Sequence, residues 1–295
     1  MTALSDCNPV TTSMHGKICV ITGANTGIGK AAAESLAALG ATIVMVCRNR
    51  AKGERALADI VTAAANGGRR GSAELCIADL SSQSDVRAVA AGILAAHPRI
   101  DVLVNNAGVA LKHRELTVDG IERTFAVNYL AYFMLANLLL PGLRAAGSAR
   151  IVNVSSGAHR RGTLDFDNFQ GERSYSNIRM YSETKLEDVM FTYALARRLA
   201  GSGETVNALH PGVVATEIWR QVPVLDFLSR WLMLTPEKGA RTTIYLAASP
   251  DVEGVTGQYF DKCRPARTIA LSHDVALQER LWATSVALTG VGADV

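Results

Sequence analysis

A chain of 295 residues with 48% hydrophobic and 19% charged residues is long enough to bury a large core, in one α/β domain or in two smaller ones. Its 30 Lys and Arg against 27 Asp and Glu give a formal net charge of +3, which excludes the strongly basic character of a nucleic-acid-binding chain. The composition therefore does not indicate nucleic-acid binding and does not identify any other macromolecular partner.

The first sixteen residues have neither the basic start nor the apolar block of a signal peptide, and we expect residues 1–16 to form a flexible tail. The most apolar later stretch, from Val127 to Leu143, contains two asparagines and a Pro-Gly pair. It is too short and too polar for a stable membrane span, so we interpret it as a buried helix.

The cysteines are odd in number, widely spaced and without a CxxC pair, so they predict neither a zinc site nor a redox disulfide. We expect all of them to be reduced, which is typical of a cytoplasmic protein, and we expect no metal. They are Cys7, Cys19, Cys47, Cys76 and Cys263.

From residue 17 onward, β-branched runs alternate with alanine-rich helical stretches, which is the pattern of βαβ units. The sequence therefore predicts one Rossmann-type doubly wound α/β domain over residues 17–295, with a seven-stranded parallel sheet and helices on both faces. The runs are KICVIT at 17, TIVMVC at 42, AELCIA at 73, IDVLVN at 100, ARIVNV at 149, TVNALH at 205 and GQYF at 257. Helices are expected over Gly29 to Leu39 and Tyr181 to Leu199, among others, from their apolar stripes.

The segment KICVITGANTGIGKAAAESLAALG places a glycine loop between the first strand and the first helix. Gly23 allows a tight turn, and Gly27 and Gly29 let the backbone approach a pyrophosphate without a Cβ in the way. The helix that follows offers unpaired N–H groups to the anion. This context indicates a dinucleotide site rather than a purely structural turn.

The spacing TGxxxGxG resembles the short-chain dehydrogenase/reductase family. The resemblance implies an NAD(P)-binding fold in which Asp79 follows the third strand near the adenine, although an Asp that caps the next helix is an equally ordinary role. It also implies an NNAG element along the ribose and a PG segment beside the nicotinamide. The cofactor contacts implied in this way are Asn25, Thr26, Ile28, Asp79, Leu80, Asn105, Ala107, Gly108, Pro211, Gly212, Val214 and Thr216, with the loop glycines.

The second strand ends in Val46-Cys47-Arg48-Asn49-Arg50, without the carboxylate that would bind the ribose hydroxyls of NAD. A guanidinium pairs bidentately with phosphate, so Arg48, with Asn49 beside it, suits the 2′-phosphate of NADP(H). We therefore expect NADP(H) rather than NAD(H). The alternative is that Arg48 is a solvated loop arginine.

Reduction of a carbonyl by hydride transfer needs a proton donor for the developing alkoxide. A tyrosine can serve near neutral pH where its surroundings stabilise the phenolate by about 3–4 kcal/mol, which a nearby ammonium can supply. In RMYSETKLEDVMF, Tyr181 and Lys185 are four residues apart, so they lie on one face of a helix. They match the YxxxK pair of the family and are implied to contact the cofactor as well, although such a pair alone is common on amphipathic helices.

Two further positions complete the catalytic tetrad that the resemblance implies. Ser156, in ARIVNVSSG, matches the serine that hydrogen-bonds the substrate carbonyl, and strand alternation lets only one of the two neighbouring serines face the cofactor. Asn128, in TFAVNYLAYF, matches the asparagine that holds a water near the lysine. The alternative for Asn128 is a polar residue that pins a helix kink.

The interval from Ser156 to Tyr181 is 25 residues, about twice the usual family spacing. This insertion, the GANTGIGK loop, the Cys-Arg pair at 47 and the ERLW at 279 resemble the retinol dehydrogenase and WW-domain oxidoreductase branch. Animal members often carry a membrane anchor ahead of the glycine loop, and none is seen here. We therefore expect a soluble relative.

The segment from 218 to 234, IWRQVPVLDFLSRWLML, is expected to cover the nicotinamide. Its aromatic and leucine side chains favour a small lipophilic carbonyl or alcohol substrate, such as a retinoid, aldehyde, steroid or polyketide, but also fit a core or homo-oligomer surface. Three alternatives stay open: a 3-ketoacyl or polyketide reductase, a non-catalytic NADP(H) sensor or scaffold, and a membrane- or partner-binding protein.

Overall fold

The computed structural model describes residues 7–212 and 234–295, and its centre is one eight-stranded sheet in the order β3-β2-β1-β4-β5-β6-β7-β8. The seven predicted strands are all present and parallel, and the short β8 adds an antiparallel edge through a hairpin with β7. The predicted fold class is therefore confirmed. The strands are β1 (Ile18–Thr22), β2 (Thr42–Cys47), β3 (Ser72–Ile77), β4 (Val102–Asn105), β5 (Arg150–Val154), β6 (Thr205–His210), β7 (Gln258–Asp261) and β8 (Arg264–Pro265).

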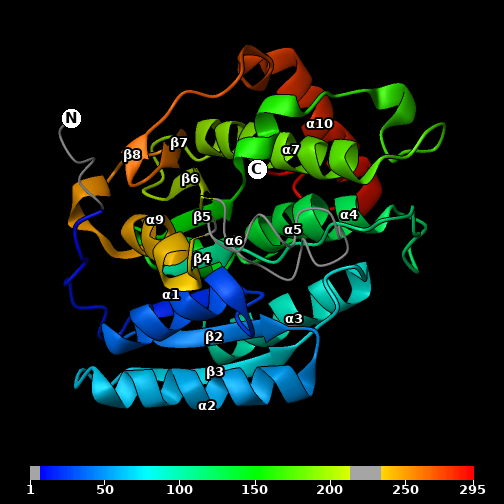
Figure 1. Cartoon of the computed structure of the whole chain (residues 1–295). Coiled ribbons are helices and arrows are strands. Elements are labelled where there is room, and N and C mark those ends of the chain that lie inside the picture. Colours follow the sequence, from blue (N-terminus) through cyan, green and yellow to red (C-terminus); the bar gives the residue numbers. More distant parts are fainter. Residues whose placement is uncertain (1–6, 213–233) are drawn as a thin grey trace.

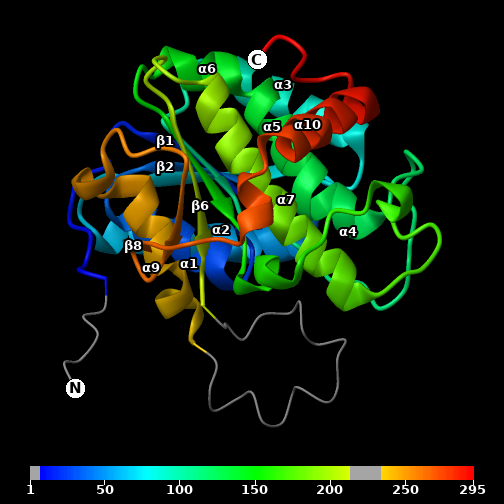
Figure 2. The same cartoon turned by 90° about the horizontal axis from the view of Figure 1, so that it is seen from above.

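Helices cover both faces of this sheet (Figures 1 and 2). One layer contains α1 (Gly27–Ala38), α2 (Arg50–Asn66) and α9 (Pro236–Ala248), and the other contains α3 (Gln83–Ala96), α5 (Ala131–Leu138) and α7 (Asn177–Arg198). Each strand contributes to both layers because successive side chains point to opposite faces. In β1, for example, Val20 packs into the layer of α7, while Cys19 and Ile21 pack into the layer of α1.

The C-terminal helix α10 (Val275–Thr289) packs against α7, outside the α5–α7 layer (Figure 2). Its Trp282 ring lies 4.9 Å from the ring of Phe133 and 5.9 Å from that of Phe191. The Arg198 guanidinium stacks 3.9 Å from the Trp282 ring centroid, and Glu279 pairs with Arg198. The late ERLW motif therefore anchors the last helix to the helix that carries Tyr181.

The apolar stretch from Val127 to Leu143 is divided into several pieces. A short α4 (Arg123–Phe125) leads into a π-helical turn (Ala126–Leu130), which is followed by α5 and α6 (Leu140–Ala145). Apart from Leu138 and Pro141 the stretch is buried, as expected, but it is not one continuous helix, and Pro141 lies in the first turn of α6. Among residues 7–212 and 234–295, no helix is long and apolar enough to cross a bilayer.

The chain before β1 contacts the domain at several points. Met14 is buried, its N–H donates to the carbonyl of Leu39 at 2.8 Å, and Arg69 donates to the carbonyl of Thr11. The remaining short elements within residues 7–212 and 234–295 are 3-10 turns, namely η2 (Gly157–Arg161), η3 (Phe166–Asn168), η6 (Pro250–Val252) and η7 (Ala270–His273).

The prediction that all five cysteines are reduced is wrong for two of them. Cys7 and Cys263 form a disulfide that joins the N-terminal segment to the β7–β8 hairpin, whereas Cys19, Cys47 and Cys76 are free. Spacing could not reveal the pair because its partners are 256 residues apart and meet only after the sheet has assembled. The cytoplasmic location relied on reduced cysteines and stays a prediction.

Candidate active site

The glycine loop between β1 and α1 has the backbone that a phosphate needs. Gly23 and Gly27 have φ angles of +68° and +56°, which favour glycine. A Cβ on Gly29 would lie 2.4 Å from Nδ2 of Asn106 and 2.6 Å from the carbonyl oxygen of Gly23, so only glycine fits there. The loop is therefore closed tightly against the end of β4.

The N-terminus of α1 is not capped by a side chain. Thr26 is the N-cap residue, in an extended conformation, but its hydroxyl makes no capping hydrogen bond. The first N–H groups of this 12-residue helix therefore remain available to an anion. Asn25 and Thr26 are half-buried in this loop, while Ile28 is buried against Ala240 of α9.

Thr22, the last residue of β1, fixes the residues that follow β4 next to the glycine loop. The Thr22 hydroxyl accepts the N–H groups of Asn106 and Ala107 at 2.8 and 3.0 Å, and Asn106 Nδ2 donates to the Thr22 carbonyl. Asn105 is fully buried and donates to Asn153 of β5, while its Oδ1 has no partner among the described residues. Ala107 and Gly108, the next predicted contacts, are half-buried.

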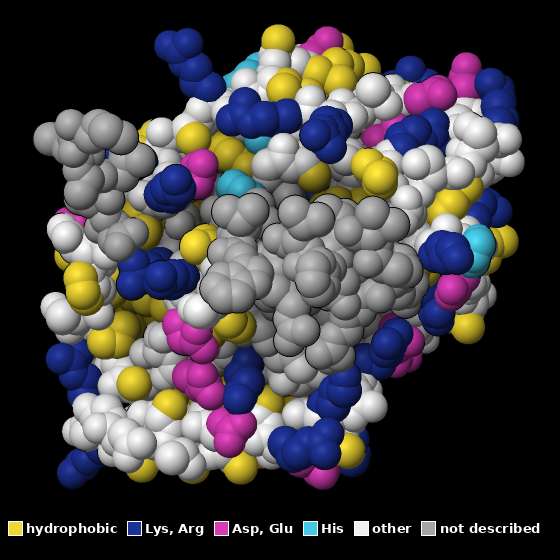
Figure 3. All heavy atoms as spheres, viewed as in Figure 1, with side chains coloured by type: hydrophobic (Ala, Val, Ile, Leu, Met, Phe, Trp, Pro, Cys, Tyr) yellow, Lys and Arg dark blue, Asp and Glu magenta, His cyan; other side chains and the backbone are white. Residues whose placement is uncertain are grey.

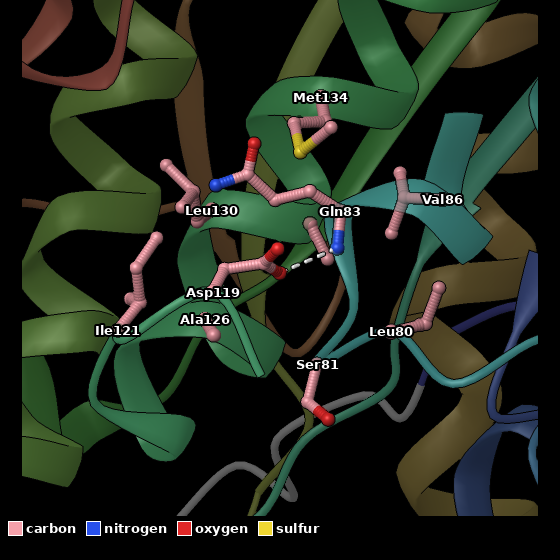
Figure 4. A pocket seen from close by; sticks show the side chains of 10 residues that line it. Leu80, Ser81, Gln83, Val86, Asp119, Ile121, Ala126, Leu130 and Met134 are labelled. Carbon is pink, nitrogen blue, oxygen red and sulfur yellow. Dashed lines mark hydrogen bonds between the residues drawn. The ribbon is translucent and has the colours of Figure 1, made fainter. Parts of the chain in front are cut away.

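The residues after β3 make a local turn. The Asp79 carboxylate accepts the N–H and the hydroxyl of Ser81 at 2.9 and 2.8 Å, while Ser82 is the N-cap of α3. Leu80 lines a small pocket with Val86 and other side chains (Figure 4). The volume of this cavity is about 10 Å³, which is too small for a nucleotide.

Arg48 and Asn49 join β2 to α2. Both are exposed. The Asn49 side chain accepts the N–H of Lys52 at 2.9 Å and so caps α2, a structural role that was not predicted from the sequence. Arg48 lies at the carboxyl end of β2, next to the end of β1 that carries the glycine loop. Arg48 is therefore accessible to a ligand that lies at the carboxyl ends of β1 and β2.

The reaction end of the site lies on α7, which is buried from Met180 to Thr192. Tyr181 is 8% exposed and Lys185 is 3% exposed. The Lys185 Nζ lies 5.9 Å from the ring centroid of Tyr181 and 5.3 Å from that of Tyr132 on α5. The hydroxyl of Tyr132 donates to the carbonyl of Ala107 at 2.7 Å. Tyr132 of α5 therefore contacts both Lys185 and the loop after β4.

The Lys185 ammonium is held by two acceptors. It donates to the carbonyl of Val154, at the end of β5, at 3.0 Å and to Oδ2 of Asp188 at 2.8 Å. Within the part of the chain that the structure describes, these bonds use two of its three N–H donors. Burial raises the pKa of Asp188 to about 7, although the charge and hydrogen bond of Lys185 act in the opposite direction.

Two more carboxyl groups are buried on α7, and neither these two nor Asp188 were predicted from the sequence. Burial raises the pKa of Glu187 well above its usual value, and repulsion from Glu183 and Asp188 adds to this effect. Burial also raises the pKa of Glu183, which accepts the hydroxyl of Thr163 at 2.7 Å. The signal that could have revealed them is the run ETKLED, whose polar residues are too many for one solvent-facing side of a helix.

The two serines at the end of β5 have different surroundings. The Ser155 hydroxyl is buried and donates to the carbonyl of Lys185 at 2.6 Å, so it fixes β5 to α7. Ser156 is half-buried and its hydroxyl accepts the N–H of Ala158 at 3.1 Å. Ser156 therefore has the more accessible hydroxyl at the strand end beside Lys185.

Asn128 lies in the π-helical turn and is fully buried. Its Oδ1 accepts the N–H of Val109 at 2.7 Å, and its Nδ2 donates to the carbonyl of Val109 and to the hydroxyl of Thr184. Asn128 thus joins the irregular helix, the loop after β4 and α7. The π-turn agrees with both interpretations of Asn128. Such turns are frequent at functional sites, as expected for an asparagine that holds a water near Lys185, and they are irregular, as expected for a polar residue that pins a helix kink.

The segment after β6 is described only as far as Gly212. Pro211 and Gly212 are half-buried, and a Cβ on Gly212, whose φ is +86°, would lie 2.5 Å from Leu234. Val214 and Thr216 lie outside the described residues. The same is true of the expected substrate-covering segment, except for Leu234.

The long insertion between Ser156 and Tyr181 is ordered by its own contacts. It contains the turns η2 and η3, and the rings of Phe166 and Phe169 stack at 5.2 Å. Asn168 accepts the N–H of Arg173, and Tyr175 donates to the carbonyl of Leu111 at 3.0 Å. The insertion therefore connects the N-terminal end of α7 to the loop that follows β4.

The surface and the described side chains agree with the modest net charge. Figure 3 shows Lys and Arg side chains scattered over one face, with Asp and Glu side chains among them. In the described ranges, no three His, Cys, Asp or Glu side chains are grouped so that they could hold a metal ion.

A glycine loop after β1, the uncapped N-terminus of α1 and a buried Tyr–Lys pair beside the end of β5 are the features of a dinucleotide-binding α/β fold. The family model for short chain dehydrogenases matches residues 17–224. Retinol dehydrogenase 14 of Mus musculus is 41% identical, over 94% of this chain and 87% of its own length. Retinol dehydrogenase 13 of Homo sapiens is 40% identical, over 97% and 88%.

Solved structures agree. An uncharacterised protein from Mycobacterium Paratuberculosis has a TM-score of 0.78 at 33% identity, covering 96% of this chain and 97% of its own. A protein described as a putative NAD(P)-dependent gluconate 5-dehydrogenase from Beutenbergia cavernae, with NADP bound at low occupancy, has a TM-score of 0.68 at 32% identity, covering 85% of this chain and 96% of its own. The chain belongs to the short-chain dehydrogenase family, in its retinol dehydrogenase-like branch.

Proposed function

We propose that this protein is an NADP(H)-dependent oxidoreductase that interconverts a carbonyl and an alcohol on a lipophilic substrate. The observation that carries the proposal is the buried Lys185 ammonium, 5.9 Å from the ring of Tyr181, at the end of the strand that delivers Ser156. The dinucleotide fits this chain because the Gly29 position has no room for a Cβ and α1 has an uncapped N-terminus.

A bound nicotinamide would supply or accept the hydride. Ser156 would donate a hydrogen bond to the substrate oxygen, on which negative charge develops during reduction. Tyr181 would donate a proton to that oxygen, or accept one during oxidation. The Lys185 ammonium would stabilise the phenolate that is left, and its third N–H would be free to bind a hydroxyl of the cofactor.

The preference for NADP(H) is supported by the end of β2. Arg48 is exposed there, and residues 46–50 contain no carboxylate that would bind a ribose diol. A guanidinium at this place offers two parallel N–H donors to a 2′-phosphate. The alternative, a solvated arginine without a ligand, predicts equal use of NADP(H) and NAD(H).

The lipophilic substrate is supported by the similarity to retinol dehydrogenases over nearly the whole chain. The buried reaction end agrees with it, because Tyr181 and Lys185 are both less than one tenth exposed. Two other readings make different predictions. A 3-ketoacyl or polyketide reductase would prefer thioester substrates, and a sensor or scaffold would bind NADP(H) without turnover.

The test is a substrate panel. NADPH absorbance is followed with retinal, long-chain aldehydes, steroid ketones and ketoacyl thioesters, and each rate is compared with that for a short water-soluble aldehyde. The proposal predicts turnover that rises with the apolar size of the substrate. Turnover confined to ketoacyl thioesters would favour the biosynthetic reductase. NADPH binding without turnover on any member would favour the sensor and contradict the proposal.

A further inference from the structure

His210, the last residue of β6, contacts the loop that carries Ser156. The N–H of Gly157 donates to Nδ1 of His210 at 3.0 Å. A Cβ placed on Gly157 would lie 3.4 Å from Nε2 of the same ring, so the imidazole lies directly against the Gly157 backbone. A histidine from one strand end therefore supports the residue that follows Ser156 at the next strand end.

This contact is the only described hydrogen bond that ties residues 156–159 to another element. The Ser156 hydroxyl accepts the N–H of Ala158, and the Ser156 carbonyl accepts the N–H of His159. The His159 ring is also bonded to the Ser156 carbonyl, at 2.7 Å from its Nδ1. These bonds stay within the turn, whereas the bond to His210 connects Gly157 directly to β6. The same 3-10 turn is also held by Arg160, which donates to the carbonyl of Arg267, and by the His159 ring, which lies 4.7 Å from the ring of Tyr259.

The direction of this bond determines the protonation state of His210. An imidazole nitrogen accepts a hydrogen bond only when it carries no proton, so Nδ1 is the acceptor and the single ring proton lies on Nε2. A protonated ring has N–H groups on both nitrogens and cannot accept from Gly157. Protonation of His210 would therefore remove the hydrogen bond from Gly157 to β6, while the bond from the N–H of Ser155 to the carbonyl of Leu209 would remain.

The groups that face His210 favour the neutral ring overall. Burial lowers the pKa of His210, and the charges of Arg160 in η2 and Lys262 in the β7–β8 turn lower it further. Asp261, which is opposite His210 in the β6–β7 register, acts in the other direction. His159 lies close enough that the charge of either ring would disfavour the other, and its own pKa is lowered mainly by burial.

We propose that His210 is a positioning residue, which holds the Ser156 hydroxyl in its working orientation through the N–H of Gly157 and releases it when the ring is protonated. This inference depends on the role proposed above for Ser156. It predicts an acid limb in the pH profile that belongs to His210 and not to the groups that transfer the proton.

Two substitutions separate the acceptor from the titration. His210→Asn keeps an acceptor oxygen near the position of Nδ1 but does not titrate, whereas His210→Leu keeps the bulk and removes the acceptor. We expect His210→Leu to lower kcat roughly ten- to hundredfold with little change in KM, because a positioning contact of this kind acts mainly in the transition state. We expect His210→Asn to recover most of that loss and to remove the acid limb, which should lie below pH 6.5 because burial lowers the pKa of His210. His113→Asn, at an exposed histidine, should leave both unchanged.

A second measurement does not depend on turnover. In uniformly ¹⁵N-labelled protein, NMR should show the His210 ring with its proton on Nε2 at pH 7.5, and the Gly157 amide should exchange faster as this ring titrates. Failure of the proposed function would leave this NMR result intact. A proton on Nδ1, an acid limb that persists in His210→Asn, or wild-type kcat in His210→Leu would each overturn the proposal.

Discussion

The helices α2 and α7 cover opposite faces of the same sheet, but they bury different kinds of side chain. In α2 the buried residues are small or apolar, namely Gly53, Ala56, Ile60 and Ala64, and the charges face solvent. In α7 the buried residues also include Ser182, Glu183, Thr184, Lys185, Glu187 and Asp188. Burial of charged groups costs folding free energy unless the groups are paired. A helix that nevertheless buries several of them is therefore the one expected to carry the reaction.

Two ion pairs of nearly equal length make this comparison measurable. Lys185 and Asp188 are 2.8 Å apart with side chains 4% and 0% exposed, whereas Lys30 of α1 and Asp59 of α2 are 2.7 Å apart with side chains 29% and 57% exposed. Solvent screens the second pair and not the first.

The largest effect is expected at the buried pair. Asp188→Ala removes the partner of a buried ammonium and should lower the free energy of unfolding by about 3–5 kcal/mol. The matched variant Asp59→Ala should cost about 1 kcal/mol or less. Asp188→Asn keeps an acceptor and should be milder than Asp188→Ala. Urea denaturation at pH 7 measures all three, and equal losses in the two alanine variants would contradict the contrast between the helices.

The next effect is a pH dependence of stability at Glu187. Because the pKa of Glu187 is raised in the folded state, this state binds more protons than the unfolded chain above pH 4.5. The contribution of Glu187 to stability is therefore present at pH 4 and is lost as the pH rises. Glu187→Gln removes this loss and should stabilise the protein at pH 8 by about 1–3 kcal/mol, with little change at pH 4.

The control for Glu187 is Glu54→Gln on α2, where the side chain is 58% exposed. Thermal unfolding of both variants at pH 4, 6 and 8 gives the comparison. If Glu187→Gln were destabilising at pH 8, the carboxylate would have a charged partner and the account of α7 as a helix of buried acids would be wrong.

The smallest effect on stability is expected where α2 meets the proposed cofactor site. Arg48→Asp should leave the free energy of unfolding within about 0.5 kcal/mol of wild type, because the side chain is exposed. It should raise KM for NADPH roughly ten- to hundredfold, since a charge-assisted contact is lost, and should not raise KM for NADH. Arg55→Asp, also exposed on α2, serves as the control. Equal increases for both cofactors would refute a 2′-phosphate contact.

The strands and the glycine loop could be predicted from the sequence because their signals are local. Buried parallel strands such as TIVMVC are continuous apolar runs between turn residues, and Gly23 and Gly29 fall at the loop that such a strand requires. The disulfide could not be predicted, since its two cysteines are near only in the folded chain.

The contacts that surround the reactive residues could not be predicted from the sequence either. The spacing of Tyr181 and Lys185 indicates a shared helix face, but not that Asp188 holds the ammonium or that Val154 accepts from it. The contact of Gly157 with His210 joins two strand ends 53 residues apart. Such contacts depend on side-chain directions at strand ends, which a periodicity does not specify.

The most direct test of the account is Tyr181→Phe, which removes one hydroxyl and keeps the ring. NADPH binding, followed by its fluorescence, should stay within a few fold of wild type, while kcat/KM on the best panel substrate should fall at least a hundredfold, as expected for loss of a proton donor. Tyr193→Phe, farther along α7, should keep both. Undiminished turnover in Tyr181→Phe would contradict the central claim that α7 carries the reaction.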